Sequence, residues 1–137
     1  MIKIFALKTK HDLASKSKEI LTQKNLYDAQ YTKVFKDDSV ILVSNAENYQ
    51  EPIFKANDTV VISDCFISNR RQLLKDYGLD PNLITNELIL YLYRNKGTAF
   101  VEELEGQFSI LIYNTISKEL FAFVDQFGIN PLYYSNQ

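Results

Sequence analysis

The chain has 137 residues, of which 46% are hydrophobic, and it carries a formal net charge of −2. This length suits one domain of roughly 100–200 residues, and the apolar content excludes a disordered chain. The single cysteine and the single histidine exclude a disulfide scaffold, a cysteine-rich zinc module, and any metal site or catalytic relay that needs two histidines. Composition alone therefore indicates a soluble intracellular α+β domain.

Hydrophobic patterning divides the first half of the chain into short elements. The predicted elements, in chain order, are a strand at 2–7, a helix at 12–24, strands at 31–36 and 40–43, a loop at 45–57 and a strand at 59–63. Asp12 is suited to cap the helix, and residues 36–39 form the turn of a hairpin. Pro52 and the polar residues around it favour the loop.

The second half contains two groups of helices and strands. The predicted elements are helices at 70–77, 87–96 and 98–104, followed by strands at 107–113 and 120–125. Asn69 is a candidate N-cap of the first helix, and Thr85 or Asn86 of the second, while Gly78 and Gly97 end them. Strands in groups with helices between them favour a layered α+β fold in one domain, residues 1–137, over a doubly wound parallel sheet.

Charge and hydropathy restrict the partners and the compartment. Six lysines against two acidic residues in 1–24 are interpreted as a solvated helix face, with contact to an anionic surface as the alternative. A sequence pI of 5.4 argues against binding to a nucleic-acid backbone. The N-terminus does not resemble a signal peptide, and the apolar runs fall below the ~18 residues of a membrane span. We therefore expect a cytoplasmic protein without nucleic-acid or membrane partners.

Two motifs near the C-terminus resemble those of one known family. Leu104-Glu-Gly-Gln-Phe108 and Asp125-Gln-Phe-Gly-Ile-Asn-Pro-Leu-Tyr-Tyr134 are similar to the glutaminase domain of the asparagine synthetase family. Weaker matches precede them in the same order: Ile4-Phe5, Glu51-Pro52-Ile53, Ile67-Ser-Asn69 and Glu87-Leu-Ile-Leu-Tyr-Leu-Tyr93. The resemblance covers essentially the whole chain.

The resemblance implies an αββα sandwich of the N-terminal-nucleophile, class II amidotransferase type. We expect this sandwich to be truncated at its C-terminus, because the family's domain continues into an Ala-Ser-Glu strand. The family then has an ATP-pyrophosphatase synthetase domain with a Ser-Gly-Gly-Leu-Asp-Ser loop, and these 137 residues do not contain it.

The resemblance also implies a cysteine at residue 2, whose thiolate attacks the glutamine amide while the free α-amine acts as base. Ile2 occupies that position, and isoleucine offers no nucleophile. An arginine that would hold the glutamine carboxylate corresponds to Ala46, which has no charge.

Three further positions of the family fall on residues of different chemistry. The Asn-Gly pair of the oxyanion hole corresponds to Asp64-Cys65, and a carboxylate there would repel a developing oxyanion. The glutamate that follows corresponds to Phe66, and the aspartate that pairs with the substrate ammonium corresponds to Thr85. The resemblance therefore predicts a degenerate glutaminase without catalytic, cofactor-binding or metal-binding residues.

Three functional hypotheses remain open. The preferred one is a catalytically inactive domain with a structural or interaction role, as in β-lactam synthetase and lasso-peptide cyclase relatives. The second is an active amidohydrolase that uses Cys65 or Asp64 in a relocated role. The third is a small-ligand module that uses the vacated glutamine pocket.

The preferred hypothesis implies particular partners. By resemblance, the chain docks against an ATP-dependent, amide-forming synthetase domain or chain, and in a peptide-modification system it helps to hold a precursor peptide. An open sheet edge after Tyr134 predicts a homo-oligomer or a partner chain there. Asn69-Arg70-Arg71 could hold an anion, but we interpret it as a helix cap with solvated charges.

Overall fold

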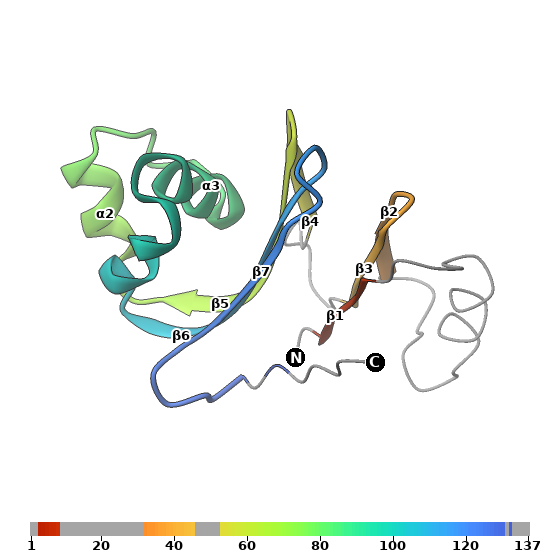
Figure 1. Ribbon diagram of the computed structural model, residues 1–137. Helices are drawn as coiled ribbons and strands as arrows, with labels where there is room; N and C mark the ends of the chain where they lie inside the picture. The colour runs from red at the N-terminus through yellow and green to blue at the C-terminus, as the bar shows by residue number, and fades with distance from the viewer. Residues whose placement is uncertain (1–2, 9–31, 46–52, 131, 133–137) are drawn as a thin grey trace.

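The computed structural model describes residues 3–8, 32–45, 53–130 and 132. Two antiparallel sheets and one layer of helices make up this part of the chain (Figure 1), which confirms the α+β class. The predicted helix at 12–24 lies outside the described residues.

Sheet A contains β1 (Lys3–Lys8), β2 (Thr32–Lys36) and β3 (Val40–Asn45) in the order β1-β3-β2. The predicted hairpin is present, with β2 and β3 antiparallel. Its turn forms because the Asp37 carboxylate accepts the backbone N–H groups of Ser39 at 2.7 Å and Val40 at 3.0 Å. A short acidic side chain that satisfies nearby backbone donors is typical of such turns.

Sheet B contains β4 (Ile53–Ala56), β5 (Thr59–Ile67), β6 (Gly106–Asn114) and β7 (Leu120–Val124) in that order. The loop predicted over 45–57 is wrong at its C-terminal end, because 53–56 pairs with β5. Pro52 and Asn57 mask this four-residue strand in the sequence. β5 also extends four residues beyond its predicted end, since Asp64–Ile67 pair with Gly106–Ser109 of β6.

Helices α2 (Arg70–Asp76) and α3 (Thr85–Lys96) and the 3₁₀ helix η1 (Gly97–Glu103) lie between β5 and β6 in the chain. Gly78 and Gly97 have positive φ angles of 62° and 58° at the predicted helix ends. The predicted caps of α3, Thr85 and Asn86, are wrong. Asn69 lies at the predicted N-cap position of α2, but its side chain makes no cap hydrogen bond. Asn69 instead bonds to the Glu103 carbonyl and the Glu105 N–H, and α3 starts after Ile84, whose N–H bonds to the Glu87 carboxylate at 3.0 Å.

Sheet B separates two apolar cores, because successive strand side chains point to opposite faces. Its helix-side face packs Val61, Ile110 and Ile112 against α2, α3 and η1. The other face packs Val60, Ile62, Leu111 and Tyr113 against Val40 and Leu42 of sheet A. The described layers are therefore helices, sheet B and sheet A, seen from left to right in Figure 1.

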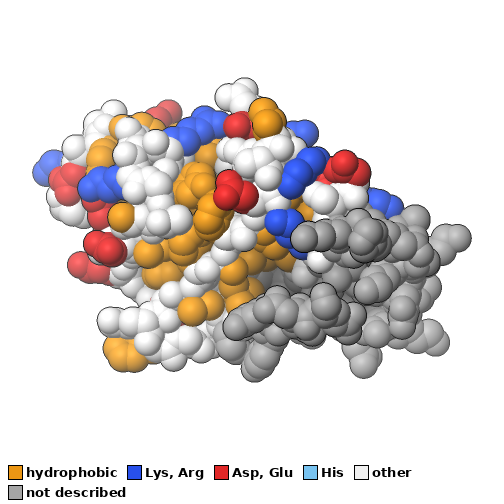
Figure 2. All heavy atoms as spheres, in the orientation of Figure 1, with side chains coloured by type: hydrophobic (Ala, Val, Ile, Leu, Met, Phe, Trp, Pro, Cys, Tyr) orange, Lys and Arg blue, Asp and Glu red, His pale blue; other side chains and the backbone are white. Residues whose placement is uncertain are grey.

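Strand β7 forms an edge of sheet B. Among the described strands it pairs only with β6, and its sequence Leu-Phe-Ala-Phe-Val has no charged residue. Figure 2 shows hydrophobic side chains gathered over the middle of the molecule, where Figure 1 places β6 and β7. The predicted association through an open edge stays a prediction.

Candidate functional site

Four of the six positions singled out in the sequence belong to the part of the chain that the structure describes. Ile2 and Ala46 lie outside the described residues. The other four are Asp64, Cys65 and Phe66 on β5 and Thr85 at the start of α3. Asp64, Cys65 and Phe66 lie near the C-terminal end of β5.

Alternation along β5 separates Asp64 from Cys65. Asp64 and Phe66 share the face of Val60 and Ile62, which pack toward sheet A. Cys65 shares the opposite face with Val61 and packs toward the helices. Two adjacent residues of a strand cannot direct their side chains to one reacting atom, so Asp64 cannot serve as a base for Cys65.

Cys65 lies in a small polar cluster under α3. Its Sγ is 3.4 Å from Ser63 Oγ, and that hydroxyl donates a hydrogen bond of 2.6 Å to Asn86 Oδ1. Burial raises the pKa of the Cys65 thiol, and the Asp64 charge adds to the rise while the Ser63 hydrogen bond opposes it. The thiol therefore stays protonated at neutral pH, which is the opposite of an activated nucleophile. Sequence alternation alone could have placed Ser63 beside Cys65.

The opposite face of β5 carries one acid and one exposed aromatic ring. Burial raises the pKa of the half-buried Asp64 carboxyl. Phe66 is 70% exposed and provides no proton donor or acceptor. Within the described ranges, no group of three His, Cys, Asp or Glu residues could hold a metal ion. The side chains of Asp64, Cys65 and Phe66 therefore provide neither an activated nucleophile nor a hydrogen-bond donor for an oxyanion.

Gly106, in the first motif of the resemblance, permits a close approach of two strands. Its φ is 131°, and a Cβ atom there would lie 2.0 Å from the Phe66 carbonyl oxygen. Phe108, two residues later, is 5% exposed and belongs to the helix-side core. The glycine and the aromatic residue of this motif therefore have structural roles.

Asp125, in the second motif, organises the turn after β7. Its carboxylate accepts the N–H groups of Phe108 at 3.2 Å and Phe127 at 2.9 Å. Burial alone would raise the pKa of this carboxyl, but the backbone donors outweigh it and the pKa is lowered. Gly128 has a φ of 60° and donates its N–H to the Asp125 carbonyl at 3.0 Å. The Asp-x-x-Gly spacing is thus the requirement of a turn.

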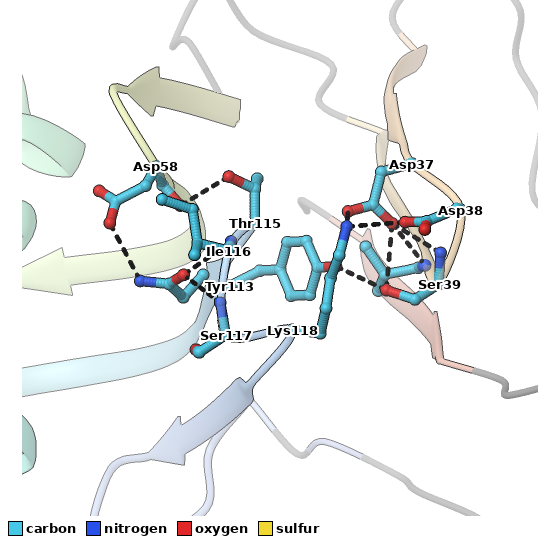
Figure 3. A network of polar contacts seen from close by, with 11 residues as sticks. Asp37, Asp38, Ser39, Asp58, Tyr113, Thr115, Ile116, Ser117 and Lys118 are labelled. Atoms are coloured by element: carbon cyan, nitrogen blue, oxygen red, sulfur yellow. Dashed lines mark hydrogen bonds and ion pairs between the residues drawn. The ribbon is translucent and has the colours of Figure 1, made fainter.

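The far end of the β5–β6 pair carries a polar network that joins the two sheets (Figure 3). The fully buried Tyr113 donates its hydroxyl hydrogen to Asp37 Oδ2 at 2.6 Å and lies 2.7 Å from Ser39 Oγ. Lys118 Nζ lies 2.9 Å from Asp37 Oδ2 and 2.7 Å from Asp38 Oδ1. Sequence reasoning did not find this network, because Tyr113 and Asp37 are 76 positions apart.

Every resolved pKa shift in this network moves a group away from acid–base activity at neutral pH. Burial raises the pKa of Tyr113, and the carboxylates of Asp38 and Asp37 raise that of Lys118. Burial opposes ionisation of Asp37, but the hydroxyl of Tyr113 and its other donors prevail and lower the pKa. A general acid or base that works at neutral pH has a pKa near 7. The pKa values of Tyr113, Lys118 and Asp37 are all shifted away from that range, so we interpret this network as structural.

Comparison with known proteins places these features in a family. A model of the glutamine amidotransferase domain matches residues 37–137. Asparagine synthetase [glutamine-hydrolyzing] 2 of Bacillus subtilis (strain 168) is 43% identical over 49 residues, which are 36% of this chain and 7% of that protein. Asparagine synthetase B [glutamine-hydrolyzing] of Escherichia coli (strain K12) is 26% identical over 141 aligned positions, with 95% of this chain and 26% of that protein covered.

A third relative extends the comparison to plants. Asparagine synthetase [glutamine-hydrolyzing] 2 of Oryza sativa subsp. japonica is 32% identical over 97 residues, which are 71% of this chain and 14% of that protein. The chain thus spans about a quarter or less of the length of these relatives. In the part of the chain that the structure describes, no helix is long and apolar enough to cross a membrane.

Proposed function

Because the chain belongs to the glutamine amidotransferase domain family and is a glutaminase domain of the asparagine synthetase type, we propose that it has lost glutamine hydrolysis and acts through its surfaces. The observation that carries this proposal is a division between two kinds of family positions. Those with scaffold roles are retained, and those expected to do chemistry are replaced.

The retained positions have defined physical roles. Gly106 allows the approach of the Phe66 carbonyl, and Asp125 holds the turn after β7. Phe108 fills the helix-side core. A chain selected only for its fold would keep these residues, because each substitution would introduce a clash, an unsatisfied N–H group or a cavity.

The replaced positions remove each step that glutamine hydrolysis needs. Ile2 offers no nucleophile, and Ala46 and Thr85 offer no charge to the carboxylate and ammonium of glutamine. Asp64 would repel an oxyanion. Cys65, the single thiol of the chain, faces the helices and has a raised pKa. This supports an inactive domain over a hydrolase that relocated its nucleophile to Cys65.

The greater length of the relatives supports the proposal that this domain packs against a further domain or chain. They are glutamine-hydrolyzing asparagine synthetases by name, and this chain matches 7–26% of their lengths. We infer that the domain packs against an ATP-dependent synthetase domain or chain and stabilises it without supplying ammonia. A precursor peptide is a further partner in a peptide-modification system, and the cytoplasm is the proposed compartment.

Glutamate release from glutamine tests the loss of activity. The purified chain is incubated with glutamine, beside the Bacillus subtilis relative as the active control, and glutamate is measured. We expect no release above the buffer blank. Release that persists in the properly folded protein would overturn the proposal. If Cys65→Ala then abolished it while Ser63→Ala did not, the relocated nucleophile would be established.

Calorimetric titration with glutamine and asparagine tests the third hypothesis. We expect no saturable heat, because the charged groups that would hold the α-carboxylate and α-ammonium are absent from the positions that the family uses. Saturable binding of either amino acid would support a ligand-binding module in place of an interaction domain.

A further inference from the structure

A groove on the helical layer has no role in the proposed function. It is about 420 Å³ in volume and lies along α2 and the turn that follows it. Its lining residues are Arg70, Arg71, Leu74, Lys75, Leu79 and Pro81. Figure 1 places α2 at the outer side of the helical layer, with sheet B between it and sheet A.

The charged residues of this groove are all basic. Arg71 and Lys75 are exposed, and in the described part of the chain neither has an ion-pair partner. Arg70 is half-buried and donates from Nη2 to the Leu83 carbonyl. That hydrogen bond uses one N–H group of the guanidinium. The guanidinium has five N–H donors, so the others can bind a ligand.

The nearest acidic side chains in the sequence do not line the groove and have other partners. Asp76 Oδ1 accepts the Gln72 amide at 2.6 Å. Asp80 Oδ1 accepts the Asn82 N–H at 2.8 Å. The lining itself thus presents three cations and no anion, although the whole chain has a net charge of −2.

The floor of the groove is apolar and already formed. Leu74 is 4% exposed and Leu79 is partly buried against the helix-side core. The Leu79 N–H bonds to the Leu74 carbonyl at 2.8 Å, and Gly78 turns the chain with a φ of 62°. A floor held by backbone hydrogen bonds needs little reordering on binding, which lowers the entropic cost of association.

We propose that this groove docks an acidic peptide segment of a partner protein, with a hydrophobic side chain on the Leu74–Leu79 floor and carboxylates at Arg70, Arg71 and Lys75. Arginine pairs with carboxylates through two parallel hydrogen bonds. A nucleic acid fits less well, because the lining has no aromatic ring on which bases could stack.

The experiment measures fluorescence anisotropy of a labelled twelve-residue peptide that alternates Glu-Asp pairs with Leu, titrated with the full chain. Three other probes are run beside it: the same peptide with Lys for each acid, the same peptide with Ser for each Leu, and a single-stranded oligonucleotide. We expect saturable binding of the first peptide, weaker binding of the Ser peptide, and none of the Lys peptide.

Two charge-reversal variants locate the contact. R71E/K75E should weaken binding at least about tenfold, since it replaces attraction by repulsion at the groove. K33E/K36E changes the net charge by the same amount on exposed residues of β2 and should weaken binding less than about twofold. Circular dichroism confirms that both variants are folded.

Three results would overturn the proposal. Equal weakening in the two variants would mean attraction by the whole surface, and unchanged binding in R71E/K75E would place the contact elsewhere. Equal or tighter binding of the oligonucleotide would make the groove a nucleic-acid site. None of these readouts depends on glutaminase activity.

Discussion

The two ends of the β5–β6 strand pair are stabilised in different ways. At the Thr59–Asn114 end, side chains form the network of Figure 3, and Tyr113 is completely buried. At the Ile67–Gly106 end, the backbone provides the close contact, and Phe66 is 70% exposed. One end of the pair therefore depends on side-chain identity, whereas the other depends on a glycine and leaves β5 side chains free to vary.

Gly106→Ala should give the largest effect on stability among substitutions at the two ends of the β5–β6 pair. The added Cβ would lie 2.0 Å from the Phe66 carbonyl oxygen, on a backbone with φ of 131°. We expect a loss of more than about 3 kcal/mol in the free energy of unfolding, measured by urea denaturation. Gly78→Ala is the matched control, since its φ is 62° with no atom within 4 Å, and it should cost about 1 kcal/mol. Equal losses would contradict the role of close approach.

Tyr113→Phe should have an intermediate effect at the network end. It removes the hydroxyl between Asp37 and Ser39 while the ring remains in the core. We expect a loss of about 1–2 kcal/mol in the free energy of unfolding, because the half-buried Asp37 carboxylate loses a donor. Tyr91→Phe is the control, and a similar loss there would show that the effect belongs to tyrosine hydroxyls in general.

The network end should also determine stability in acid. The pKa of Asp37 in the folded protein is lowered below its usual 3.8, mainly because the Tyr113 hydroxyl and other donors outweigh burial. A carboxyl group whose pKa is lower in the folded protein than in the unfolded chain stabilises the fold fully at pH values above the unfolded pKa. This contribution is lost as the pH falls from the unfolded pKa through the folded pKa. Denaturation midpoints measured from about pH 6 to 3 should fall more steeply in the wild type than in Asp37→Asn.

Asp38→Asn provides the comparison for that pH series. Its side chain is 79% exposed, so the ion pair with Lys118 is screened by solvent and contributes little. The pH dependence of this variant should match that of the wild type. If it flattened as much as Asp37→Asn, the acid sensitivity would belong to the surface pair and not to the buried network.

Phe66→Ser should have the smallest effect. The ring is 70% exposed, so its removal should change the free energy of unfolding by less than about 0.5 kcal/mol. Phe100→Ala, at 0% exposure, should cost about 3–5 kcal/mol in the same assay. A large loss at Phe66 would remove the contrast between the two ends.

Much of the fold follows from local patterns, and the exceptions have physical causes. The strand at Val40 and the helix ends at Gly78 and Gly97 are confirmed, because apolar runs and left-handed glycines are local signals. The strand at 53–56 and the extension of β5 from Asp64 to Ile67 were not predicted. Both depend on pairing with β5 or β6, and a single segment does not encode its partner strand.

In the candidate site, too, local sequence identified some residues but not the contacts that they make with other segments. The family resemblance identified Gly106 and Asp125 as motif residues, and their structural roles require the Phe66 carbonyl and the Phe108 N–H, which come from other segments. The side chain of Asn69 was predicted to cap α2, but its tertiary partners outcompete the helix terminus. Arg70 and Arg71 were interpreted as solvated charges, because a groove formed by a helix and the following turn is not visible in a linear pattern.

The contacts of Asn69 have a consequence for how the domain could be rebuilt. Ser68 N–H bonds to the Glu105 carbonyl at 2.8 Å, and the Asn69 side chain bonds to Glu103 and Glu105. These hydrogen bonds hold the start of the helical segment, at residues 68–69, against its end, at residues 103–105, beside the point where β5 and β6 pair. The entropic cost of closing a loop rises slowly with its length. Because these hydrogen bonds hold the ends of the helical segment together, insertions or exchanges within the segment can be accommodated without shifting the register of sheet B.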